Sequence, residues 1–111
     1  MLNEENLLAA GYRKFNDTFK QALGAYQKRI VVEKADNEWH TEYFINVYHY
    51  KLDLPDHSHE SWQLDMAFDR RSKLAPYAWV TYRLETDTPI ENIETIAEDL
   101  FYGNNGMSYD D

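Results

Sequence analysis

Four stretches of the chain alternate between apolar and polar positions with a period of two, which is typical of β-strands with one buried face. They span residues 26–34, 41–52, 61–69 and 77–85. The second is the densest in β-branched and aromatic residues, which favour strands. Short polar or charged connections separate them, so we expect the strands to pair antiparallel in the order in which they occur.

After the fourth strand the apolar period changes to that of a helix, over residues 89–102. Thr88 is expected to be the N-cap, with Pro89 at the first helical position and Glu91 completing a capping box. Gly103 suits the end of this helix. Its apolar stripe consists of Ile90, Ile93, Ile96, Ala97, Leu100 and Phe101.

The N-terminal region is less regular. Asn3 can cap a short helix that ends near Gly11. Residues 12–24 fit either a second short helix, capped by Asn16 and carrying Phe19 and Leu23 on one face, or an ordered loop. The pattern alone does not decide between them.

Together these elements predict a single α+β domain over residues 1–111. It has a four-stranded antiparallel meander sheet, a C-terminal amphipathic helix on one face and a short N-terminal helix. The expected core is the set of apolar residues that face one another between helix and sheet: Ile45, Val47, Leu64, Met66, Val80, Leu84, Ile93 and Leu100.

The other face of this sheet is unusually aromatic. It carries Phe44, Tyr48, Tyr50, Tyr77 and Trp79, with Asn46, Gln63, Asp65, Thr81 and Arg83 among them. One interpretation is that the N-terminal segment folds over part of it through Leu7, Leu8, Tyr12, Phe15 and Phe19. A second is a partner-binding or homodimer surface, since interface centres favour Tyr, Trp and Arg. A third, a platform on which nucleic-acid bases stack, normally comes with a basic groove.

Composition narrows the class of protein. With 43% hydrophobic and 15% aromatic residues, the 111-residue chain is expected to fold as a globule. The absence of Cys excludes disulfides, thiolate catalysis and Cys-ligated zinc. No signal peptide and no membrane-spanning run is recognisable, so we expect a cytoplasmic protein. The pI of about 4.8 disfavours direct binding to nucleic acid or to anionic membranes.

The charge is unevenly distributed. Residues 85–111 contain eight acidic residues and no Lys, Arg or His, so they carry −8 of the formal net charge of −9. A block of one sign creates a local field that affects partner choice and association rate more than it affects the fold.

Within this block, Glu91, Glu94 and Glu98 fall within an arc of about 60° on the expected helix. No Lys stands four residues on to balance them, and Asp99 adds a charge near the negative end of the helix dipole. Stability therefore does not require this arrangement. The four carboxylates form either a solvated helix face or a row that docks a basic surface.

Residues 56–60 are the only stretch that resembles a metal site. His57 and His59 stand two apart, with Asp53, Asp56 and Glu60 nearby. Two imidazoles without a third are a weak site, so we expect the His57/His59 loop to be mobile and without metal, and no cofactor to be bound.

Signals for catalysis are weak as well. The chain contains no nucleophile elbow and no Gly-rich phosphate loop. Asp65 and Asp69 could form a carboxylate pair, but the alternation of strand charges explains them equally well. Arg70, Arg71 and Lys73 form a basic turn that is solvated by default. We therefore do not expect an enzyme.

These observations favour a small acidic protein-binding module, an inhibitor or regulator that docks the basic surface of a nucleic-acid-acting protein. Anti-restriction, anti-CRISPR and toxin immunity proteins share this general character of being small, acidic and Cys-poor, which also points to a phage or mobile-element protein. The analogy is one of class and transfers no residues. The alternative is a homodimeric small-molecule or metal-binding module that uses the aromatic sheet face or the His57/His59 loop. An accessory protein of a larger assembly is a third hypothesis.

Overall fold

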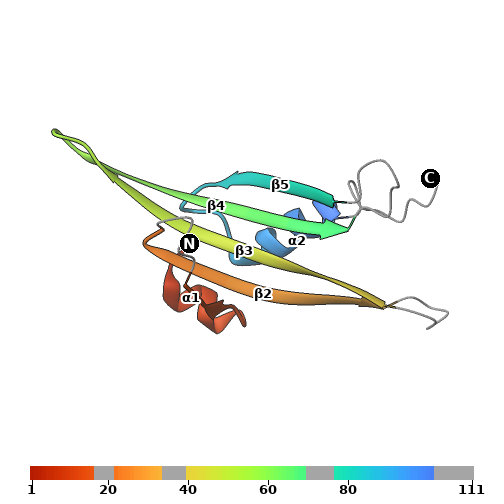
Figure 1. Ribbon diagram of the computed structural model, residues 1–111. Helices are drawn as coiled ribbons and strands as arrows, with labels where there is room; N and C mark the ends of the chain where they lie inside the picture. The colour runs from red at the N-terminus through yellow and green to blue at the C-terminus, as the bar shows by residue number, and fades with distance from the viewer. Residues whose placement is uncertain (17–21, 34–39, 70–76, 102–111) are drawn as a thin grey trace.

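The computed structural model describes residues 1–16, 22–33, 40–69 and 77–101 (Figure 1). Its elements are α1 (Glu4–Ala9), β1 (Arg13–Lys14), β2 (Gly24–Glu33), β3 (His40–Asp53), β4 (Ser58–Asp69), β5 (Tyr77–Leu84) and α2 (Ile90–Phe101). The α+β class, the antiparallel sheet and both helices are confirmed, but the sheet has five strands rather than four.

The additional strand lies in the stretch for which the sequence left two alternatives. Arg13 and Lys14 pair with Gln27 and Tyr26 of β2. The pairing continues with a hydrogen bond of 2.9 Å from the Phe15 N–H to the carbonyl of Ala25. Two residues are too short to show a period of two, which is why the pattern missed this strand. Of the alternative helix capped by Asn16, residues 17–21 lie outside the described residues, and Leu23, expected on its apolar face, is exposed and not helical.

The strands follow one another across the sheet in chain order, each antiparallel to the next. Register places Tyr26 opposite Val47, Val47 opposite Leu64, and Leu64 opposite Tyr82, so these residues share one face of the sheet. Both helices lie against this face, because residues of α1, α2 and the sheet's inner positions form one buried cluster.

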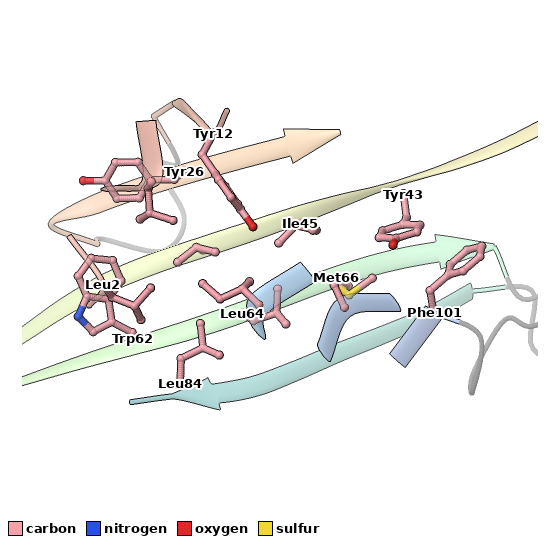
Figure 2. Close-up of a cluster of buried hydrophobic side chains, with 14 residues drawn as sticks. Leu2, Tyr12, Tyr26, Tyr43, Ile45, Trp62, Leu64, Met66, Leu84 and Phe101 are labelled. Carbon is pink, nitrogen blue, oxygen red and sulfur yellow. The ribbon is translucent and has the colours of Figure 1, made fainter. Parts of the chain in front are cut away.

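That cluster is the core of the molecule (Figure 2). From α2 it takes Ile93, Ala97 and Phe101, which are spaced by four residues and lie on one side of the helix. The other members are Leu2, Leu7, Tyr12, Tyr26, Tyr43, Ile45, Val47, Trp62, Leu64, Met66 and Leu84. The predicted core is largely confirmed, except that Val80 and Leu100 are only partly buried at its margin.

The N-terminal segment lies on the opposite side of the sheet from the one proposed for it. Leu7 of α1 and Tyr12 are buried in the core between the helices and the sheet, and Leu8 is exposed. Among the described residues of this segment, Phe15 contacts the second face, edge-on to Tyr48 with ring centroids 6.0 Å apart. Because the helix face of the sheet is wider than α2 can cover, α1 and Tyr12 fill the part over β2. Phe19 lies outside the described residues.

The helix termini are built differently. In α1 the side chain of Asn3 accepts a hydrogen bond of 2.8 Å from the N–H of Asn6, as predicted, and Gly11 follows with φ of +96°. In α2 the predicted capping box is wrong. The hydroxyl of Thr88 accepts from the N–H of Glu85 at 3.0 Å, because it closes the turn that ends β5. In addition, α2 begins at Ile90, so the residue directly before the helix is Pro89 and not Thr88.

The β3–β4 hairpin extends beyond its neighbours. The last β3 residue that pairs with β2 is His49, opposite Gly24, and the first β4 residue that pairs with β5 is Trp62, opposite Leu84. Residues 50–61 therefore form a two-stranded ribbon that projects from the sheet, at the upper left of Figure 1. In the described part of the chain, neither helix has the length and apolar character needed to cross a membrane.

Candidate protein-binding surfaces

The outer side of α2 is acidic. Glu91, Glu98 and Asp99 are exposed on the helix, and Glu85 and Asp87 are exposed in the turn before it. The buried spacing of Ile93, Ala97 and Phe101 fixes the rotation of the helix, so these carboxylates project away from the core. Asp110 and Asp111 of the acidic block lie outside the described residues.

Glu94 differs from the other predicted members of the row. Its carboxylate lies 2.7 Å from the ammonium of Lys28 on β2. The same ammonium donates a hydrogen bond of 2.9 Å to the carbonyl of Ala10 at the end of α1, and it lies 5.7 Å from the centre of the Tyr12 ring. Lys28 therefore joins both helices to the sheet. Glu94 is a structural partner rather than an open charge, which no spacing along the helix could reveal.

The other lysine beside the helices is also paired. Lys14 lies 2.8 Å from the carboxylate of Glu4, which also accepts a hydrogen bond of 3.0 Å from the hydroxyl of Tyr26. Lys14 and then Tyr26 lower the pKa of Glu4. Burial, followed by the neighbouring Glu4, raises the pKa of Tyr26 to about 12.

Burial, with a smaller effect of Glu94, likewise raises the pKa of the Tyr12 phenol well above its ordinary value. Tyr12 and Tyr26 thus stay neutral and anchor the lysine-bearing edge of the sheet to the helices. Within the described chain, no cation pairs with the carboxylates of Glu85, Asp87, Glu91, Glu98 and Asp99.

On the second face of the sheet, two of the predicted aromatic residues, Tyr48 and Tyr50, pack on each other. Tyr48 is buried and contacts both Phe15 and Tyr50. The rings of Tyr48 and Tyr50 are stacked, with centroids 6.2 Å apart. Phe44 and Tyr50 are half-buried. Tyr77 and Trp79 stand in β5 opposite Asp69 and Ala67, and their side chains are outside the described part of the structure.

A row of polar side chains crosses the same face over three strands, β2 to β4. The amide of Gln27 donates to the side-chain oxygen of Asn46 at 2.9 Å, and Asn46 stands opposite Asp65 in the register. Asp65 accepts a hydrogen bond of 2.8 Å from the amide of Gln63 and is 0% exposed. Asp65 thus lies on the second face, as the alternation of the strand predicts, but it is buried there, which the alternation did not indicate. The burial of Asp65 depends on the register between strands, which cannot be read from the sequence.

The predicted metal loop is the tip of the β3–β4 ribbon. His57 is exposed, and its Nδ1 lies 2.8 Å from the carboxylate of Asp56. The hydroxyl of Ser58 donates to Asp53 at 2.7 Å, and His59 is exposed at the start of β4. Among the described residues, no three His, Asp or Glu side chains are grouped so that they could hold a metal ion.

His49 makes a contact that the sequence did not indicate. Its ring stacks almost parallel to Trp62, with centroids 4.1 Å apart and an interplanar angle of 5°. Its Nε2 lies 3.7 Å from the carboxylate of Glu60. His49 therefore extends the aromatic core toward the projecting ribbon.

The basic turn predicted at residues 70–73 lies outside the described residues.

A half-open cavity of about 250 Å³ lies where β1 meets the start of β2. Its lining consists of Lys14, Phe15, Asn16, Ala22, Leu23, Gly24 and Ala25. Lys14 is the only charged group of this lining, and it is already paired with Glu4. The cavity thus brings together no set of reacting groups.

Comparison of the chain with protein-family models, with curated proteins and with solved structures gave no match in any of the three.

Proposed function

We propose that this protein is a binding module whose acidic helix surface docks a basic surface of another protein. The observation that carries the proposal is the set of five exposed carboxylates on α2 and its preceding turn. They lack a cationic partner in the described chain, although both lysines next to the helices are paired with other acids. We define Glu85, Asp87, Glu91, Glu98 and Asp99 as the acidic surface.

Electrostatics within the fold argues against a stabilising role for two of these charges. Glu98 and Asp99 lie in the last turn of α2, where the negative end of the helix dipole disfavours anions, and the helix has no basic residue there. An arrangement that is mildly unfavourable for folding is useful in association, because a concentrated field steers an oppositely charged partner.

The acidic surface is also well positioned for binding. α2 is anchored by three side chains, Ile93, Ala97 and Phe101, that are 0% exposed. Carboxylates on a fixed helix lose less conformational freedom on binding than carboxylates on a loop, so more of the interaction energy remains for affinity.

We further propose that the partner acts on nucleic acid. Proteins that bind phosphate backbones carry Lys and Arg surfaces, and a row of carboxylates competes for those same side chains. Occupation of such a surface makes this protein an inhibitor or regulator. This role requires no reacting group of its own, so we propose binding and not catalysis.

The test combines partner capture with binding kinetics. The parent protein and a Glu91→Gln/Glu98→Gln/Asp99→Asn variant serve as baits in extracts of the native host at low and moderate salt. A nucleic-acid-acting protein that the parent retains at low salt and the variant does not retain is then purified. We expect the association rate constant of the variant for this partner to fall by about tenfold or more and to depend less on salt.

Glu94→Gln is the matched control. It removes one negative charge from the same helix, as each change in the triple variant does, but from a carboxylate that already pairs with Lys28. We expect it to change the association rate much less than the triple change does. Equal association rates and equal salt slopes for the triple variant and the parent would contradict the proposal.

The sheet's second face supports a second candidate, a homodimeric or small-molecule-binding module. Phe44 and Tyr50 are partly exposed beside the polar row of Gln27, Asn46 and Gln63, and such a mixture of aromatic and amide groups is typical of binding surfaces. Tyr50→Ala measures this hypothesis directly. Loss of partner capture with this variant, together with normal capture by the triple acidic variant, would favour the sheet face.

A further inference from the structure

The lateral edges of the sheet are β5 on one side and β1 with the rest of β2 on the other, and β1 pairs with only two residues of β2. β1 pairs with β2 through Arg13 and Lys14, opposite Gln27 and Tyr26. At Gly11, with φ of +96°, the chain turns from α1 into β1. Residues 29–33 of β2 therefore continue beyond β1, and no described strand pairs along their outer edge. Figure 1 shows this half of β2 running past α1 toward the connection with β3.

The hydrogen bond between β1 and β2 identifies the backbone groups on that edge. The carbonyl of Ala25 accepts from the Phe15 N–H, so Ala25 directs its backbone groups toward β1. Peptide groups alternate along an antiparallel strand, and every second residue from Ala25 therefore faces the same way. Arg29, Val31 and Glu33 direct their N–H and C=O groups outward, and Ile30 and Val32 direct theirs toward β3.

The side chains on this edge offer little protection against pairing with another strand. Natural edge strands are usually blunted by Pro, by bulges or by charged side chains, and residues 29–33 carry charges only at their two ends, Arg29 and Glu33. Here Ile30, Val31 and Val32 are three consecutive β-branched residues, a type that favours sheets. Val31 is 44% exposed, and Ile30 is partly buried against the core.

We infer that a second copy of this chain pairs with this edge, antiparallel and related by a two-fold axis at Val31. A symmetric pairing through outward-facing residues places Val31 opposite its own counterpart, joined by two reciprocal N–H to C=O hydrogen bonds. The same register places Ile30 opposite Val32 of the second copy. The two five-stranded sheets then form one continuous sheet.

Charge supports this register. It sets Arg29 of each copy opposite Glu33 of the other, so two pairs of unlike charges flank the axis. Arg29 already interacts within its own chain, so the argument requires only that the charges that meet are of opposite sign. The next position outward sets Lys28 opposite Lys34 of the other copy, a pair of like charges that Glu94 offsets by its ion pair with Lys28.

The size of the contact sets its strength. Five residues from each copy bury less than the roughly 1,000 Å² of a stable interface, so the dimer is weak and depends on concentration. A two-fold axis perpendicular to the sheet leaves the helices of both copies on the same side. This inference does not rest on the proposed function, because it concerns the sheet edge and needs no other protein.

Sedimentation velocity across a range of protein concentrations tests it. We expect the parent chain to shift from monomer toward dimer as its concentration rises. Val31→Pro removes the outward N–H at the axis while leaving the β2–β3 hydrogen bonds in place, since Pro is tolerated on an edge when its nitrogen faces outward. We expect the dissociation constant of this variant to rise at least about tenfold. Val31→Thr, which keeps the N–H and the branched side chain, should dimerise like the parent, and circular dichroism checks the fold of each variant.

A charge exchange tests the register. Arg29→Glu and Glu33→Arg should each weaken self-association, because each change sets like charges opposite one another. An equimolar mixture of the two variants should restore a heterodimer, in which unlike charges again face each other. The inference is overturned if the parent stays monomeric at every concentration, if Val31→Pro dimerises as well as Val31→Thr does, or if the mixture fails to associate.

Discussion

Lys28 ties both helices to the sheet, and its removal should destabilise the fold more than removal of a surface charge would. Its ammonium contacts the Ala10 carbonyl of α1 and the Glu94 carboxylate of α2. We consider Lys28→Met, which keeps the length and apolar part of the side chain, Glu94→Gln, and the two changes together.

The expected magnitudes follow from exposure. The Lys28 side chain is 26% exposed and that of Glu94 is 38% exposed, so solvent screens the ion pair to about 0.5–1 kcal/mol. A hydrogen bond from a charged donor to a partly buried carbonyl contributes about 1.5–2 kcal/mol more. Lys28→Met should therefore lower the free energy of unfolding by about 2–3 kcal/mol, and Glu94→Gln by less than about 1 kcal/mol.

Urea denaturation of the parent, both single variants and the double variant gives the coupling between the two side chains. We expect a coupling of about 0.5–1 kcal/mol that shrinks as salt is added. For a chain of this length, each kcal/mol corresponds to about 4 °C in Tm, so thermal unfolding provides a second measure.

Two results would refute this reasoning. If Lys28→Met and Glu94→Gln had equal and small effects, the contact with Ala10 would contribute nothing. If the effects of the two changes simply added, the carboxylate of Glu94 and the ammonium of Lys28 would not interact in solution. Glu94 would then be an unpaired charge, like the other carboxylates on the outer side of α2.

Two further predictions concern the core. Leu64→Ala should lower the free energy of unfolding by about 2–5 kcal/mol and Leu100→Ala by clearly less, since Leu64 is fully buried whereas Leu100 is only partly buried. Equal shifts of the urea midpoint would contradict this placement. Burial raises the pKa of Tyr26 to about 12, whereas the phenol of the unfolded chain ionises near pH 10. The stability that this difference contributes is therefore fully present below about pH 10, and it is lost as the pH rises through 12. Tyr26→Phe should therefore weaken the alkaline loss of stability measured by denaturation, and an unchanged alkaline slope would argue against a buried, neutral Tyr26.

The long elements could be predicted from the sequence because each repeats its period several times. β3 alternates over His40–Asp53, and α2 shows three inward positions at a spacing of four. β1 could not be predicted, because its two residues complete no period and its pairing with β2 is a tertiary contact. The placement of α1 was missed for a related reason. Its apolar residues fit either face of the sheet, and only the uncovered space beside α2 selects one.

The acidic surface was predictable in part. Helical geometry correctly placed Glu91 and Glu98 outside the buried stripe. The separate role of Glu94 depends on Lys28, which is remote in sequence and is brought near by the antiparallel register of β2. The burial of Asp65 has the same origin, since its neighbours across the sheet come from other strands.

The projecting β3–β4 ribbon has a practical consequence. A two-stranded ribbon has few contacts with the rest of a fold, so its tip opens with little effect on the core, and such tips accept foreign sequence better than other parts of a chain. Pro55 and Asp56 are exposed there, away from α2 and from the outer edge of β2. A fluorescent reporter or an affinity epitope spliced between them would leave both proposed contact regions accessible. The tip of the ribbon is thus an attachment site through which the molecule can be detected or immobilised while its interactions are measured.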